Sequence, residues 1–142
     1  MQENKLFKLS EYLNIINILI EKFSFSSLFK IYMTSLMLFY QVKSDTELRK
    51  SSHNLFKGFF SCFHLVVISN YSDFCYISEA LRINEKNGWI TVDGDNVVKN
   101  TKLDFVSNEI LKYVKKENIF DILNEIKNMS RSSFIQEVIA NV

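Results

Sequence analysis

The clearest pattern of apolar and polar positions lies between residues 73 and 101. Its first half, Asp73–Asn87, predicts an amphipathic helix, because small or apolar residues recur at the i, i+3, i+4, i+7 spacing. Ser72 or Asp73 is expected to cap the first turn, and Gly88 to close the last turn in a left-handed conformation. The inward positions are Phe74, Ile77, Ala80, Leu81 and Asn84.

The second half of this stretch predicts a β-hairpin. Trp89–Val92 is a β-type run, and Val97 and Val98 begin a return strand. Asp93-Gly94 lies between them and suits the positive φ angles of a two-residue turn. A helix followed directly by a hairpin is the second half of a winged-helix domain. The expected fold is therefore mainly α with a small β-hairpin, a winged-helix-like domain with a C-terminal helical extension.

Two strongly apolar helices are predicted before this unit. Ser10 is a suitable N-cap for a helix over Glu11–Phe23, after a short extended segment at Lys5–Leu9. This helix is apolar on most sides, which indicates burial. The second helix covers Leu28–Val42, and the polar stretch Lys43–Asn54 is expected to form a loop or an exposed short helix. The narrow wet face of the first helix is expected at Asn14, Asn17 and Glu21.

The stretch Leu55–Ser69 combines aromatic and β-branched residues, so helix and strand compete. Its phenylalanines have helical spacing, whereas Leu65–Ile68 would also suit a buried strand. Helix is the prediction retained for the whole stretch. Asn70-Tyr71-Ser72 predicts a turn before the next helix.

Three further amphipathic helices are predicted in the C-terminal part of the chain. They cover Leu103–Lys116, Glu117–Asn128 and a final segment that Ser133 opens with capping-box spacing. There is no internal repeat and no low-complexity linker. The expected organisation is a winged-helix-like domain over residues 1–102 with a helical extension over residues 103–142, packed as a single compact unit.

The aromatic content suggests a protein-binding surface. The chain has 142 residues, of which 14% are aromatic, including 13 Phe and 6 Tyr. We expect part of this aromatic surface to stay exposed and to bind a larger protein, since contiguous exposed apolar area marks partner sites. Truncation after Met129 would then abolish complex formation and leave the remaining domain folded. The expected partner-interface residues are Phe29, Tyr32, Phe56, Phe59, Phe60, Phe63, Phe134, Ile135 and Val138.

Catalytic and metal-binding signatures are weak. Cys62, Cys75, His53 and His64 form no paired ligand motif. Both cysteines are expected in apolar surroundings, and His64 in the core or at an interface. Three isolated glycines cannot build a phosphate-binding loop, and turn geometry explains the aspartates of the hairpin. We therefore expect a protein that is not an enzyme and that uses no cofactor or metal.

The cysteine count and the apolar runs indicate where in the cell the protein is expected. Two cysteines are too few for a disulfide framework, and no signal-peptide pattern opens the chain. The longest apolar runs are shorter than a membrane span or carry Lys30 and Gln41. A cytoplasmic protein without membrane association is expected.

Charge distinguishes a protein partner from nucleic acid. A DNA-reading helix presents Arg or Lys to bases and phosphates. Here the net charge is +1. The predicted reading helix carries the basic residues Arg82 and Lys86 against the acidic residues Asp73, Glu79 and Glu85, and the hairpin turn is acidic. Such a surface opposes phosphate. Nucleic-acid contact would have to use a set of basic residues together: Arg82, Lys86, Lys112, Lys115 and Lys116.

The order of these segments resembles a known family. A second helix reading SLFKIYMTSLMLFYQV precedes a helix and hairpin reading ISEALRINEKNGWITVDGDNVVKNTK, and the chain ends in MSRSSFIQEVIANV. This order is similar to the small middle-component proteins of bacterial three-component, Lamassu-like anti-phage systems, which are encoded between an SMC-like ATPase and an effector. The resemblance covers most of the chain by pattern and order. It implies a non-catalytic adaptor that docks on the ATPase and holds the effector inactive until foreign DNA is sensed, but it carries over no site residue.

Two other functions fit the same sequence. One is a winged-helix DNA-binding transcriptional regulator with a helical dimerisation tail, which would use the basic residues named above. The other is a small phage-encoded inhibitor protein that works by covering a host protein.

Overall fold

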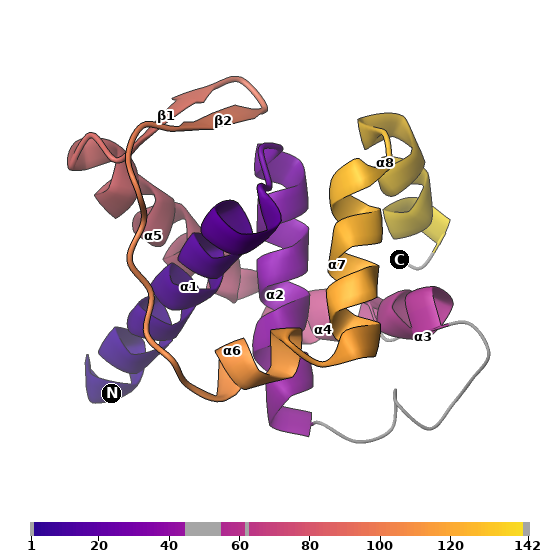
Figure 1. The fold of residues 1–142 in the computed structure, drawn as a ribbon. Helices are drawn as coiled ribbons and strands as arrows, with labels where there is room; N and C mark the ends of the chain where they lie inside the picture. Colours follow the sequence, from indigo (N-terminus) through magenta and orange to yellow (C-terminus); the bar gives the residue numbers. More distant parts are fainter. Residues whose placement is uncertain (1, 45–54, 62, 141–142) are drawn as a thin grey trace.

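The computed structural model describes residues 2–44, 55–61 and 63–140, and helices dominate them (Figure 1). None of the helices in these ranges is long and apolar enough to cross a membrane. The one sheet in these ranges is a two-stranded antiparallel hairpin. The helices are α1 (Gln2–Phe23), α2 (Leu28–Ser44), α3 (Leu55–Ser61), α4 (Phe63–Asn70), α5 (Phe74–Lys86), α6 (Glu109–Val114), α7 (Glu117–Asn128) and α8 (Arg131–Ala140), and the strands are β1 (Ile90–Asp93) and β2 (Asn96–Lys99).

Helices α1, α2 and α5 pack against one another, and the hairpin follows α5 directly, as in a winged helix (Figure 1). Gly88 closes α5 with a φ angle of 75°, the left-handed conformation expected for it. The amide of Trp89 then donates to the carbonyl of Asn84 at 2.9 Å and turns the chain toward β1. The predicted fold class, mainly α with a small β-hairpin in a winged-helix-like arrangement, is confirmed.

The hairpin turn lies one residue later than predicted. Asp93 pairs with Asn96, so the two turn residues are Gly94 and Asp95. Gly94 has a φ angle of 61° and Asp95 has no positive φ, which corresponds to a turn with glycine at its first central position. A single bridge from Ser27 to Asn96 adds the segment before α2 to the edge of the hairpin.

Helix α1 begins well before its predicted start. The expected extended segment Lys5–Leu9 is helical, and Ser10 lies inside the helix instead of capping it. Tertiary contacts explain the extension, because Leu9 packs on the core and Lys8 donates a hydrogen bond to Asp73. Helical stability in proteins comes mostly from such packing and less from local propensity.

The polar face of α1 is covered by the segment that crosses it between β2 and α6 (Figure 1). Asn14 accepts from the amide of Val106 at 2.7 Å and donates to its carbonyl at 3.3 Å. Asn17 donates to the carbonyl of Asp104 at 2.7 Å. The predicted wet face is therefore wrong for Asn14 and Asn17, which are buried because backbone groups of the crossing segment satisfy their amides.

The helix predicted to start at Leu103 starts at Glu109. The amide of Leu103 donates to the carboxylate of Glu21 at 2.9 Å. Backbone groups of Asp104 and Val106 bond to Asn17 and Asn14, so side chains of α1 hold this segment before the helix begins. Asn108 then caps α6, since its side-chain oxygen accepts from the amides two and three residues on, at 3.0 and 3.3 Å.

Helix α8 also starts earlier than predicted. The hydroxyl of Ser130 accepts from the amide of Ser133 at 3.0 Å, so Ser130 is the N-cap and Ser133 lies in the first turn. The predicted helix after Leu55 is confirmed in α3 and α4, and this includes the ambiguous stretch Leu65–Ile68. A short 3-10 turn, Tyr71–Asp73, occupies the predicted turn. Residues 45–54 of the predicted polar stretch Lys43–Asn54 lie outside the described residues.

One hydrophobic core joins the winged-helix elements to α6, α7 and α8. A continuous series of ring contacts crosses it. Phe60 lies 5.7 Å from Phe63 and 5.9 Å from Phe134, and Phe134 lies 5.6 Å from Phe29, measured between ring centroids. Aromatic side chains of α2, α3, α4 and α8 therefore pack in a single cluster, so the C-terminal helix shares its core with the rest of the chain.

Candidate functional site

An open groove of about 410 Å³ lies between the start of α2, the hairpin turn and the first residues of α5 and α8. We call it the α2–hairpin groove. Its floor and walls are apolar, and two charged side chains, Asp95 and Arg131, stand at one end. The apolar lining consists of Leu28, Phe29, Tyr32, Met33 and Phe74.

Asp95 fixes the hairpin turn against the start of α2. Its carboxylate accepts from the amide of Phe29 at 2.8 Å and from the hydroxyl of Ser27 at 2.7 Å, and its carbonyl accepts from the amide of Leu28 at 2.7 Å. The two amides are among the donors that the first turn of a helix leaves unpaired. A carboxylate there also interacts favourably with the helix dipole. The hairpin therefore serves as the N-terminal cap of α2 and forms one wall of the groove.

Neighbouring side chains hold the aromatic walls of the groove in place. The ring of Tyr32 lies 5.9 Å from that of Phe74, and its hydroxyl shares a hydrogen bond of 2.5 Å with the hydroxyl of Ser78 on α5. Phe29 packs edge-on against Phe134 of the core. Both groove aromatics are only half-buried, because one side of each ring faces the groove. Rings fixed on one side and exposed on the other provide preformed apolar area for a partner.

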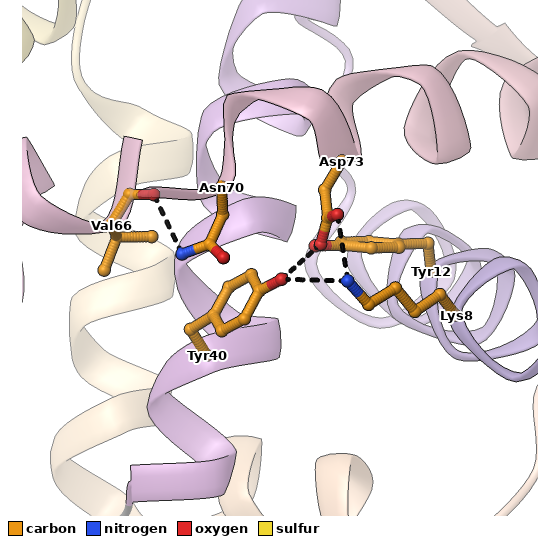
Figure 2. Close-up of polar contacts among 6 residues, drawn as sticks. All are labelled: Lys8, Tyr12, Tyr40, Val66, Asn70 and Asp73. Carbon is orange, nitrogen blue, oxygen red and sulfur yellow. Dashed lines mark hydrogen bonds and ion pairs between the residues drawn. The ribbon is translucent and has the colours of Figure 1, made fainter. Parts of the chain in front are cut away.

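A separate polar cluster joins α1, α2 and the start of α5 (Figure 2). The buried carboxylate of Asp73 accepts from Tyr12 at 2.8 Å, from Tyr40 at 2.5 Å and from the amine of Lys8 at 3.1 Å. The amine of Lys8 also lies 3.4 Å from the hydroxyl of Tyr40. Asp73 was predicted as a candidate cap for α5, but its side chain makes no capping hydrogen bond, because these three donors occupy it.

The surroundings of this cluster shift three pKa values. Burial raises the pKa of Tyr12 far above its ordinary value, and hydrogen bonding to Asp73 raises it further. The pKa of Tyr40 is raised by the same two causes. Burial acts to lower the pKa of Lys8, but its hydrogen bonds to Asp73 and Tyr40 outweigh burial, and the pKa is raised. Both phenols stay protonated and Lys8 stays charged at neutral pH, which suits a structural network better than proton transfer.

The structure places the predicted interface residues in different surroundings. Phe29 and Tyr32 line the groove. Ile135 is half-buried, and the side chain of Phe56 lies outside the described residues. The others were expected to be exposed, and this is wrong, because they fill the core: Phe59, Phe60, Phe63, Phe134 and Val138.

This burial also changes what truncation after Met129 would do. Phe134 has no exposed surface and contacts both Phe29 and Phe60. Removing α8 would open the core at that position, so the expectation that the remaining domain stays folded is not supported. Loss of binding after such a truncation could not be assigned to an interface.

The basic residues predicted for nucleic acid lie in separate places. Arg82 and Lys86 are exposed on the part of α5 that leads into the hairpin, and Arg82 pairs with Glu79 at 3.9 Å. The other three, Lys112, Lys115 and Lys116, lie on or just after α6, at the opposite end of α2 from the hairpin (Figure 1). The five residues therefore do not form the single patch that the DNA-binding alternative would need.

The remaining reactive side chains give no catalytic arrangement within the described ranges. Cys75 is exposed on α5, so its predicted apolar environment is wrong, and His64 is exposed on α4, outside the core. Cys62 and His53 lie outside the described residues. Among the residues that are described, no three His, Cys, Asp or Glu side chains gather to hold a metal ion.

Several residues of the groove were missed by sequence reasoning. Phe74 was counted among the inward residues of its helix, Asp95 was explained by turn geometry alone, and Arg131 was not considered. A usable signal exists for Asp95, because an acidic side chain can accept from the first amides of a helix such as α2, which begins at Leu28 after Ser27. No local pattern signals Arg131, whose place depends on how α8 packs.

Comparison of the chain with protein-family models, curated proteins and solved structures found no match. What the chain does is therefore inferred from its own surface and from the order of its segments.

Proposed function

We propose that this chain is a non-catalytic docking subunit, and that the α2–hairpin groove holds a segment of a larger protein partner. The observation that carries this proposal is the groove itself, a mostly apolar depression whose aromatic walls are fixed by neighbouring side chains. Grooves of this kind receive the apolar side chains of partner peptides or helices. The partner implied by the segment order is an SMC-like ATPase that works with an effector, and the chain would link the two.

The distribution of charge supports a protein partner over DNA. A winged helix that reads DNA presents its hairpin and reading helix to phosphates. Here Asp95 occupies the hairpin turn and is tied to α2. The exposed side of α5 carries Glu79 and Glu85 beside Arg82 and Lys86, so its formal charge is balanced.

The test is affinity purification of the tagged protein from the cells that encode it, with and without nuclease. Met33→Glu places a charge in the groove, and Leu65→Glu places the same charge on an exposed apolar position of α4, 68% exposed, as a matched control. We expect a stoichiometric partner that survives nuclease with the wild type and with Leu65→Glu, and at least a tenfold lower recovery with Met33→Glu.

Two results would contradict the proposal. Equal recovery of the partner with Met33→Glu would remove the groove from the interface, provided that circular dichroism shows both variants folded. Recovery of DNA without a stoichiometric protein would replace docking with a regulatory role on DNA.

A further inference from the structure

The α2–hairpin groove has a charged end that limits which partner segment it can hold. Asp95 stands there, but its two carboxylate oxygens accept from the amide of Phe29 and the hydroxyl of Ser27. Its negative charge also faces the N-terminus of α2, which carries a partial positive charge. The charge of Asp95 is thus largely compensated inside the chain.

Arg131 stands beside Asp95 and is far less occupied. Its side chain is 61% exposed, and its Nε atom lies 3.6 Å from the carboxylate of Asp95, which is beyond normal hydrogen-bond length. It also lies in the first turn of α8, where the helix dipole disfavours a cation. A guanidinium held in this position presents the fork of donors that matches a carboxylate.

A second cation, Lys30, lies close to Asp95. The amine of Lys30 is buried and donates to the carbonyls of Lys127 and Met129, at 3.2 and 2.5 Å, where α7 ends and α8 is about to begin. Lys30 also interacts electrostatically with both Asp95 and Lys127. Two cations, Lys30 and Arg131, therefore lie near the one carboxylate of Asp95, so the formal charge around it is positive.

From these charges and the apolar floor, we infer that the groove binds an acidic peptide segment. A large apolar side chain of that segment lies against Tyr32 and Met33, and a neighbouring Asp or Glu carboxylate pairs with Arg131. The volume of about 410 Å³ falls within the range of roughly 300–1,000 Å³ that is usual for ligand pockets, so one large side chain and part of its neighbour can enter. This inference rests on the proposed docking function and adds the chemistry of the partner.

A random peptide library displayed on phage, selected against the immobilised full-length protein, provides the probe. Peptides that the wild type retains and Met33→Glu does not are groove ligands, and we expect them to carry Asp or Glu close to an aromatic or aliphatic residue. The affinity of one such peptide, measured by fluorescence anisotropy, should fall about tenfold with Arg131→Gln, as for a charge-assisted pair at a partly buried site.

Arg82→Gln is the matched control. Arg82 is also exposed and belongs to one surface ion pair, with Glu79, but it lies on α5 outside the lining of the groove. We expect its loss to leave the affinity unchanged. Replacing the acidic residue of the peptide with its amide should weaken binding to the wild type as much as Arg131→Gln does, and should have little further effect on that variant.

The inference is overturned if groove ligands are neutral or basic, if Arg131→Gln and Arg82→Gln behave alike, or if the library yields no ligand that depends on the groove. The first two results leave the docking function standing, since an apolar groove can bind without a carboxylate. The docking function itself is decided separately, by the recovery of the natural partner with Met33→Glu.

Discussion

Replacing Asp73 with alanine should destabilise the protein more than any change at an exposed acidic residue. The side chain is buried at the junction of three helices and is the acceptor of three hydrogen bonds. In Asp73→Ala the hydroxyl of Tyr12, which lies in the core, loses its acceptor. Tyr40 and Lys8 are only partly buried, so water can replace the carboxylate for both of them.

The magnitude follows from this difference. A buried hydroxyl left without a partner costs about 1–3 kcal/mol. The two partly exposed donors add less, because solvent screens them, and they contribute about 1 kcal/mol together. We therefore expect Asp73→Ala to lower the free energy of unfolding by about 2–4 kcal/mol, a large part of the roughly 5–15 kcal/mol that stabilises a typical domain. Asp73→Asn keeps the volume and one acceptor oxygen, so its cost should be about half as large.

Urea unfolding followed by far-UV circular dichroism measures these changes. Asp121→Ala, at an exposed position of α7, is the control, and we expect it to change stability by no more than about 0.5 kcal/mol. The double variant Tyr12→Phe with Asp73→Ala tests the mechanism, because phenylalanine removes the orphaned hydroxyl. The double variant should be more stable than the sum of the single changes predicts by at least about 1 kcal/mol. Additive effects, or a cost of Asp73→Ala below about 1 kcal/mol, would refute the account of this cluster.

Three other changes test other parts of the structure. The pKa values of Tyr12 and Tyr40 are raised in the folded state. The stability that the two phenols provide is therefore complete below pH 10, their ordinary pKa, and is lost as the pH rises above it. Above that pH, the urea midpoint should fall less steeply with pH in Tyr12→Phe than in the wild type. Asp95→Ala should cost about 1–2 kcal/mol and should speed hydrogen exchange in the first turn of α2, and unchanged exchange there would contradict its capping role. Phe134→Ala should lower the free energy of unfolding by about 3–5 kcal/mol, measured by thermal or urea unfolding. Ile139→Ala, at a position of the same helix that is 69% exposed, should lower it by no more than about 0.5 kcal/mol. Similar costs would mean that α8 does not pack as described.

Local patterns were sufficient for the helix and hairpin around Gly88. The apolar spacing of α5, the left-handed glycine and the β-type run after it act within a few residues of one another. The turn was misplaced by one residue because Asp93-Gly94 and Gly94-Asp95 are both acceptable two-residue turns. The register that was formed also lets Asp95 cap α2, a contact between residues 66 positions apart in the chain.

Distant contacts explain the errors. Asn14 and Asn17 look like solvent-facing residues of an amphipathic helix, but their hydrogen-bond partners lie 92 and 87 positions further along the chain. The phenylalanines of α3 and α8 were interpreted as surplus to the core, whereas Phe60 of α3 packs on Phe134 of α8, and Phe134 packs on Phe29 of α2. A chain of this size can use a high aromatic content for its own packing, because few large rings fill the space between several short helices.

The segment that crosses α1 between β2 and α6 ties the hairpin to the C-terminal helices through hydrogen bonds to α1. The amide of Leu103 donates to Glu21 and the amide of Val106 donates to Asn14. Side chains of α1 therefore accept the hydrogen bonds that a neighbouring strand would accept in a sheet. We therefore expect that a displacement of the hairpin by a partner also moves α6, because the connecting segment is fixed to α1. The amides of Leu103 and Val106 should then exchange with deuterium as slowly as those of the helix beneath them, and the chain should unfold in one transition.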